Sequence, residues 1–247
     1  MEPNVLVNSL IIFLIALVGG LWGLARKIST ESLHLALSLA AGFFLGSVFL
    51  ELLPNSFSQN SSDPRTIGGL ALAGYALIYV LEKGIIPHAL SGKKSDGHDI
   101  VALTALIGLC VHSISEGSAL ALASGAENSG GILLPIALHK GIASLALGSL
   151  FALAGRSPKQ IALYLLLFAL MTPLGAALTV VLAPAGELGA GSQLYSWISA
   201  LTSGVFLYVA TADILPEVMH SRAAMGWKLL LLSAGMVIMW GAVHMGG

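Results

Sequence analysis

Eight long apolar stretches, separated by short polar connections, dominate the pattern of this chain. They cover residues 5–25, 33–53, 66–82, 100–124, 130–154, 161–183, 194–217 and 227–245. A helix needs about 20 mainly apolar residues to cross the hydrocarbon core of a bilayer, with a range of about 17–25. Because backbone groups in lipid must pair within their own segment, the stretches are predicted to be helices rather than open strands. We therefore expect an all-α, polytopic membrane protein with eight transmembrane helices.

Composition supports a membrane location and narrows the partners. Hydrophobic residues make up 56% of the 247 positions and charged residues only 9%, whereas about a quarter of a soluble domain is charged. The net charge of -1 argues against nucleic acid, which requires a basic face. The N-terminal stretch lacks the basic start of a cleavable signal peptide, so we expect it to be retained as the first span. Residues 1–247 are expected to form a single transmembrane domain in contact with the lipid bilayer.

The basic residues indicate the orientation. Nine of the eleven Lys and Arg residues fall in or beside the connections after the first, third, fifth and seventh stretches, whereas Arg65 alone falls on the other side and Lys140 within a stretch. Lys and Arg collect on the cytoplasmic side of membrane proteins, so both termini are predicted to lie outside. The short connections are typical of a prokaryotic plasma (inner) membrane. The nine residues are Arg26, Lys27, Lys83, Lys93, Lys94, Arg156, Lys159, Arg222 and Lys228.

The second and seventh stretches share a pattern. Gly-Phe-Phe-Leu at 42–45 is followed by Leu-Glu-Leu-Leu-Pro at 50–54, and Gly-Val-Phe-Leu at 204–207 is followed at the same offset by Ala-Asp-Ile-Leu-Pro at 212–216. The predicted orientation makes the two stretches run in opposite directions. This is typical of the inverted repeats of secondary transporters, whose halves flank a central site. The alternative is coincidence between two apolar helices.

The repeat also suggests where acidic residues line a pathway. It places Glu51, with Asp63 nearby in the chain, at an outer mouth. It places Asp213, Glu217 and His220 at an inner mouth. We expect a hydrated cation to be drawn in at the first group and to leave through the second.

The fourth and fifth stretches carry the candidate metal ligands. His112 and Glu116 are four residues apart and therefore project from one face of a helix. His139 lies at a similar depth in the next, antiparallel stretch. Ionisable residues at this depth are costly and usually mark a site, and two imidazoles with one carboxylate suit zinc, or less selectively iron, cobalt or manganese. Three ligands leave a position open for exchange, and Ser113 could support them; the alternative is a local ion pair and a hydrogen-bonded histidine.

Lys140 stands beside His139 in the middle of a stretch. A lysine there must face a cavity, pair with an acid or lose its proton. One interpretation is that its ammonium group takes the place of a second cation and balances Glu116 or Asp213. The alternative is that it lines water without a role.

Several of these motifs resemble those of the ZIP (Zrt/Irt-like protein) family of divalent metal transporters. The segment His-Ser-Ile-Ser-Glu-Gly at 112–117 resembles the family motif His-(Asn/Ser)-x-x-(Glu/Asp)-Gly. The His-Lys pair at 139–140 resembles the version found in one subfamily, and Met-Thr-Pro-Leu-Gly at 171–175 resembles the family's Pro-x-Gly segment. The Leu-Pro ends of the second and seventh stretches also match.

The resemblance implies eight helices in a 3+2+3 arrangement and transport of zinc toward the cytoplasm. It further implies an elevator-like motion of spans two, four, five and seven, often in a homodimer, with Zn²⁺, Fe²⁺, Mn²⁺, Co²⁺ or Cd²⁺ as substrate and no cofactor. Many family members have a further acid in span five and bind two metals. Here that position is Ala143, and Lys140 follows the histidine. We therefore expect one transported ion at a time.

Two functions from other classes stay open on the residues alone. A membrane-embedded zinc hydrolase could use the same ligands to activate water, with Glu116 as general base. No Ser or Asp is placed by motif as its substrate anchor, and an inverted repeat has no evident catalytic purpose. A scaffold or receptor without transport is disfavoured by the charges inside the spans.

Overall fold

The computed structural model describes residues 3–22, 29–57, 63–85, 97–123, 129–182 and 193–246. Within these residues the chain is all-helical and has no β-strand. Eight of the described helical segments are long and apolar enough to cross a membrane, which confirms the predicted fold class. They are Val5–Trp22, Thr30–Phe57, Pro64–Ile85, His98–Ser118, Ile136–Leu153, Pro158–Val181, Ser196–His220 and Met225–His244.

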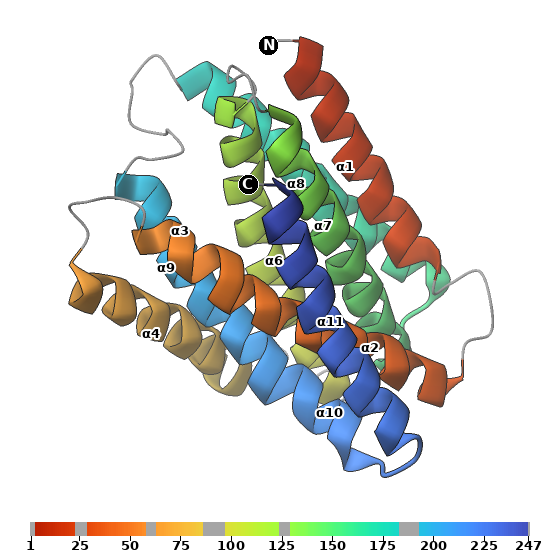
Figure 1. The fold of residues 1–247 in the computed structure, drawn as a ribbon. Helices are drawn as coiled ribbons and strands as arrows, with labels where there is room; N and C mark the ends of the chain where they lie inside the picture. The colour runs from red at the N-terminus through yellow and green to blue at the C-terminus, as the bar shows by residue number, and fades with distance from the viewer. Residues whose placement is uncertain are drawn as a thin grey trace.

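The spans are built from the helical segments labelled in Figure 1. Spans one, four, five, six and eight are single α-helices, whereas spans two, three and seven each contain a π-helical part. The single helices are α1 (Pro3–Trp22), α6 (Gly97–Ala123), α7 (Ser129–Leu153), α8 (Pro158–Leu182) and α11 (Met225–Gly246). Span two comprises α2 (Thr30–Ser47), η1 (Val48–Leu52) and α3 (Leu53–Phe57); span three comprises α4 (Pro64–Val80) and η2 (Leu81–Ile85); span seven comprises α9 (Gln193–Tyr208), η4 (Val209–Ile214) and α10 (Leu215–His220).

The π-helical parts of spans two and seven lie just before a proline. Pro54 follows η1 and Pro216 follows η4. A proline inside a helix removes one hydrogen bond and its ring clashes with the carbonyl four residues earlier. A π turn accommodates this by widening the preceding turn, and such turns are frequent at functional sites. The two turns contain Glu51 and Asp213, so the same distortion occurs at both acids of the predicted repeat.

The helix starts follow ordinary capping chemistry. The Ser29 side chain caps α2 by accepting a hydrogen bond from the Ser32 amide. Asp63 caps α4 in the same way, through the Arg65 amide at 3.3 Å, and Pro64 occupies the first turn. The exposed Asp63 thus has a structural role in addition to the one predicted for it near an outer mouth.

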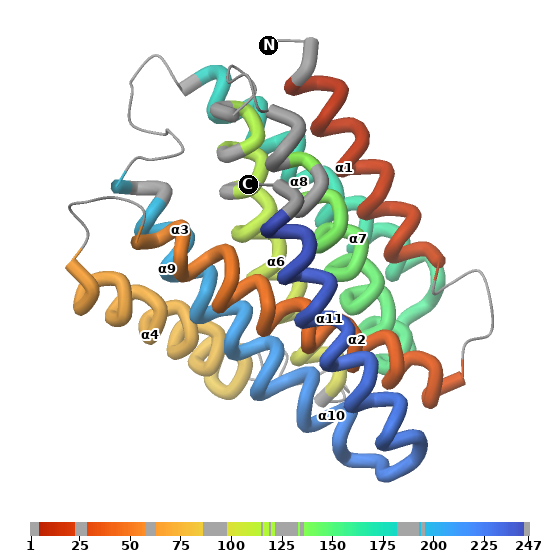
Figure 2. Tube along the Cα trace, viewed as in Figure 1, coloured from red at the N-terminus to blue at the C-terminus, as the bar shows by residue number. Residues whose placement is uncertain are grey.

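Neighbouring helices approach closely where glycine lies between them. Figure 2 shows α4 and α9 side by side at one edge of the bundle and α1 at the opposite edge. In the interior, α6 packs along α8. A Cβ atom on Gly117 would collide with the Thr172 carbonyl oxygen, and one on Gly175 with the Ile114 carbonyl oxygen. Small residues that allow such backbone contact are typical of helix packing in membranes, and here they hold the helix with the metal motif against its neighbour.

Polar contacts tie several helix ends together at one end of the bundle. Arg156, after α7, donates a hydrogen bond of 2.7 Å to Asp99 near the start of α6. Glu217 in α10 lies between His34 of α2 and His98 of α6. The starts of spans two and four therefore lie at the same end of the bundle as the ends of spans five and seven, as the predicted topology requires. We call this end of the bundle the Arg156 end.

The basic residues used to predict orientation are described only in part. Lys228 is buried in α11 and donates hydrogen bonds of 2.7 Å to the carbonyl oxygens of Val218 and Ser221. It therefore caps the end of α10 rather than lying in a solvated connection. Orientation in the membrane stays a prediction. Arg26, Lys27, Lys93 and Lys94 lie outside the described residues, as do 58–62 and 86–96 of the polar connections.

Candidate metal centre

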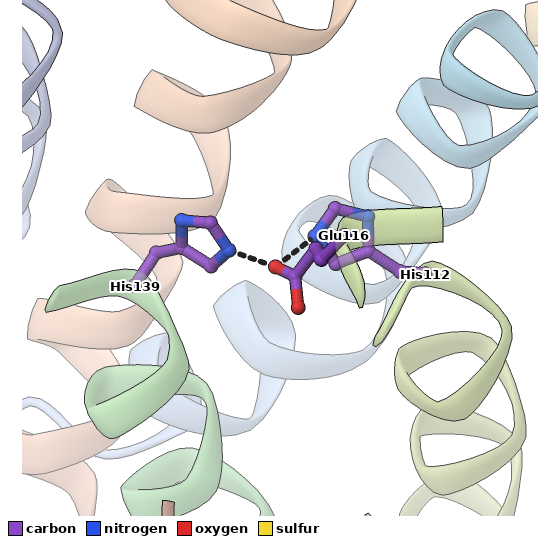
Figure 3. Close-up of side chains that lie close together, drawn as sticks. All are labelled: His112, Glu116 and His139. Atoms are coloured by element: carbon purple, nitrogen blue, oxygen red, sulfur yellow. Dashed lines mark hydrogen bonds and ion pairs between the residues drawn. The ribbon is translucent and has the colours of Figure 1, made fainter. Parts of the chain in front are cut away.

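The structure brings His112, Glu116 and His139 together at one buried point between α6 and α7 (Figure 3). One ligand atom from each residue lies within 4.8 Å of the other two. The exposed fractions of the three residues are 5%, 5% and 3%. In Figure 3 both imidazole rings point toward the same carboxylate.

Glu116 occupies the centre of this cluster. Its Oε1 lies 2.6 Å from Nε2 of His112 and is hydrogen-bonded to Nε2 of His139. The first contact follows from the spacing of four residues along α6, and the second from the packing of α7 beside α6. Two nitrogens and one oxygen thus face a common point, which is a donor set that zinc prefers, and a fourth position remains for water or another ligand.

Two phenylalanines flank the histidines. The Phe206 ring of α9 lies 4.4 Å from the His112 ring, and the Phe43 ring of α2 lies 6.3 Å from the His139 ring, both measured between centroids. Both phenylalanines lie in the similar segments of spans two and seven, but at different offsets from the glycine: Phe206 corresponds to Phe44, whose ring lies 5.0 Å from that of Phe206. Sequence reasoning noted the pattern but not that its aromatic side chains would lie against the candidate ligands.

Lys140 is paired with an acid, which is one of the alternatives that the sequence left open. Its Nζ lies 3.4 Å from Oε2 of Glu116, donates to the Ser113 hydroxyl and lies 4.0 Å from the centre of the Phe168 ring. The side chain is 1% exposed. Asp213, the other predicted partner, lies in a different environment. Ser113 therefore supports the cluster through Lys140, while also donating to the Leu109 carbonyl.

Glu51 lies beside the cluster. Its Oε2 is 3.9 Å from Nδ1 of His139, on the ring nitrogen that faces away from Glu116. At this distance the two groups are too far apart for a hydrogen bond but close enough to attract when the ring is charged. The sequence predicted Glu51 at an outer mouth; the structure adds this contact, and the role in uptake stays a prediction.

The three residues predicted for an inner mouth do not form one group. Asp213 is 5% exposed, and neither of its carboxyl oxygens has a hydrogen-bond partner among the described residues. Glu217 lies 3.3 Å from His34 and 3.2 Å from His98, and His220 is exposed. No local spacing could have identified His34, because its partner comes from a span far away in the chain.

Comparison with known proteins identifies the family. The model of the family described as ZIP zinc transporter matches residues 87–246. The chain belongs to the ZIP family. Zinc transporter ZIP1 of Takifugu rubripes is 25% identical to this ZIP protein over 262 residues, which covers 85% of each chain. Zinc transporter ZIP1 of Homo sapiens is 31% identical over 208 residues, and zinc transporter ZIP2 of Homo sapiens is 28% identical over 198 residues.

Coverage differs among these relatives. The match to the human ZIP1 includes 82% of this chain but 63% of the relative, and the match to the human ZIP2 includes 80% and 60%. Family membership makes this chain a membrane transporter rather than an enzyme, so the hydrolase alternative is not supported. The relatives named here are eukaryotic, and the predicted prokaryotic membrane gains no support from them.

Proposed function

We propose that this ZIP family member carries divalent metal ions across the membrane, zinc first among them, by binding them at His112, Glu116 and His139. The observation that carries the proposal is the convergence of two imidazoles and one carboxylate on one buried point. Ionisable side chains raise the free energy of insertion into a membrane, so they usually pair with one another or line the path of an ion. A cation at this point would replace the contacts that Glu116 now makes with both histidines.

The donor set favours exchange over permanent retention. A closed tetrahedral site holds structural zinc tightly, whereas three protein ligands leave one position for water. The substrate sheds part of its hydration on binding and regains it on release. Fe²⁺, Mn²⁺, Co²⁺ and Cd²⁺ are further candidate substrates because ligand type selects a class of ion and not a single one. No cofactor takes part.

Lys140 supports transport of one ion at a time. Its ammonium group lies next to the Glu116 oxygen that does not face the histidines. A second divalent cation on that side would meet a positive charge and would lack the acid that Ala143 replaces. Lys140 thus balances the carboxylate where a second metal would otherwise do so.

The proposed path runs from Glu51, with Asp63 outside it, to the cluster and then toward the Arg156 end of the bundle. Glu217 is the first acid proposed on the exit side, because two imidazoles already lie against its carboxylate. Asp213 and His220 were predicted with it, and of these His220 is exposed enough to meet the released ion. The direction toward the cytoplasm rests on the basic residues and on the family resemblance.

The proposed architecture is a single domain of residues 1–247 with a 3+2+3 arrangement, an inverted repeat and both termini outside. One observation supports the repeat: spans two and seven each have a π turn at their acid. Elevator-like movement of spans two, four, five and seven and assembly as a homodimer are proposed from the family resemblance.

Zinc uptake into proteoliposomes loaded with a zinc-sensitive dye tests this function. His112→Ala and His139→Ala should each abolish saturable uptake, because each removes one of three ligands. His244→Ala is the matched control, since His244 is exposed near the end of α11 and its ring contacts Trp240 of the same helix. Competition by the other four ions would rank the substrates. Normal uptake in both cluster variants would overturn the proposal.

A further inference from the structure

Three polar side chains from three different spans meet at the Arg156 end, apart from the metal cluster. The Glu217 carboxylate of α10 lies between the imidazole rings of His34, early in α2, and His98, at the start of α6. Nε2 of His34 is 3.3 Å from one carboxylate oxygen, and Nε2 of His98 is 3.2 Å from the other. We call these three residues the Glu217 clasp.

The carboxylate of the Glu217 clasp accepts both hydrogen bonds. An ionised carboxylate has no hydrogen to donate, so each imidazole presents an N–H group to it. One carboxylate oxygen is therefore engaged by span two and the other by span four. The clasp joins the end of span seven to the starts of both of these spans.

Other polar contacts secure each of the three helix ends separately. Ser29 caps the start of α2, and Lys228 caps the end of α10. Near the start of α6, Asp99 accepts a hydrogen bond from Arg156. Loss of the clasp would therefore separate the helix ends from one another and leave each helix folded.

The clasp lies on the route proposed for the leaving ion, and the inference drawn from it rests on the proposed function. Spans two, four and seven all reach the metal cluster: span four carries His112, Phe206 of span seven packs on His112, and Phe43 of span two lies near His139. The same three spans are tied together at the Arg156 end. An ion that leaves the cluster between them toward that end meets the clasp.

A divalent cation and the clasp compete for the same oxygen atoms. The N–H groups of both rings point at Glu217, and a cation bound to this carboxylate would meet the positive ends of the two N–H dipoles. In the part of the chain that the structure describes, only the metal cluster brings three potential ligands within 4.8 Å of one another, so the clasp is not a preformed metal site. We propose that the Glu217 clasp closes the Arg156 end of the path and that the leaving ion opens it by binding Glu217. Span seven is then released from spans two and four.

Distances between pairs of spin labels, measured by electron paramagnetic resonance on the full chain in lipid, test the clasp. Labels on Glu31→Cys and His220→Cys report the separation of spans two and seven. Labels on Lys159→Cys and His220→Cys report the separation of spans four and seven, because α8 packs along α6. All three positions are exposed, and Cys110→Ser removes the native thiol. Each pair should give one narrow distance in the metal-free protein.

The two histidines of the clasp provide matched variants. His34→Ala should add a longer distance to the first label pair only, and His98→Ala should add one to the second pair only, because the other ring still holds Glu217 in each case. Glu217→Ala removes both acceptors and should lengthen both distances. Unchanged distances in all three variants would overturn the proposal. A histidine variant that lengthens both pairs would do the same, since it would indicate general loosening.

Zinc tests the opening of the clasp. It should lengthen both distances in the labelled chain with an intact clasp and change neither in Glu217→Ala. The lengthening should persist in His112→Ala, because it depends on Glu217; its loss there would assign the opening to the metal cluster and overturn the proposal. Unchanged or shorter distances with zinc would also overturn it, the shorter ones because the imidazoles would then hold the ion at a second site. Absence of zinc uptake, with both distances lengthened by zinc, would contradict the transport function and leave the clasp standing.

Discussion

Replacing Lys140 with methionine removes the only ammonium group beside Glu116 among the described residues while keeping a long apolar side chain. Nζ of Lys140 lies 3.4 Å from Oε2 of Glu116. At an effective dielectric constant of about 20, two unit charges at that distance attract by about 5 kcal/mol. Both residues are buried, and removing one partner of a buried ion pair costs about 3–5 kcal/mol because the other charge is left uncompensated. We expect Lys140→Met to lower the free energy of unfolding of the metal-free protein by about this amount.

Zinc should restore much of this loss. A divalent cation bound by Glu116 and the two histidines compensates the carboxylate that Lys140 no longer balances, so zinc should stabilise Lys140→Met more than the wild type. Denaturant unfolding in detergent micelles, with and without zinc, measures both effects. Lys159→Met is the control, since Lys159 is exposed at the start of α8. Equal metal-free stability of Lys140→Met and wild type would refute the reasoning and would mean that the lysine carries no charge there.

Three further substitutions test the packing, the capping and the cluster. Gly117→Ala should lower the free energy of unfolding by about 3 kcal/mol, because the added Cβ would collide with backbone atoms and not with a flexible side chain. Gly68→Ala is the control: its Cβ would meet nothing within 4 Å, so the free energy of unfolding should stay nearly unchanged. Lys228→Met should lower the free energy of unfolding by about 1.5–3 kcal/mol, because it leaves the carbonyl groups of Val218 and Ser221 at the end of α10 without a charged donor; a stability equal to wild type would show that water replaces the ammonium group. Glu51→Gln should weaken zinc binding in calorimetry by about tenfold, because it removes a negative charge 3.9 Å from His139 and hence near the bound cation; unchanged affinity would separate Glu51 from the cluster.

The spans and the central cluster could be predicted from the sequence because they depend on short-range patterns. Apolar length alone defines the spans. The spacing of His112 and Glu116 places both on one helix face, and the short connection to the next span brings His139 to the same depth. Each step uses the geometry of a regular helix and of an antiparallel neighbour.

The surroundings of the other acids could not be predicted in this way. Glu51 and Asp213 lie in π turns, where one additional residue rotates the following side chains by about 100° relative to a regular helix. Spacing counted for a regular helix therefore does not give the face on which the side chains after each turn lie. The partners of Glu217 are His34 and His98 of other spans, so these contacts depend on how distant spans pack.

The proposed metal site is tested most directly by zinc-edge X-ray absorption of the purified protein loaded with one equivalent of zinc. The wild type should give a first shell of nitrogen and oxygen at about 2.0–2.1 Å with outer-shell scattering from two imidazoles. His112→Ala and His139→Ala should each lower this to one imidazole, whereas His244→Ala should match the wild type. A wild-type spectrum without imidazole scattering, or one that neither cluster variant changes, would contradict binding of the ion at His112, Glu116 and His139.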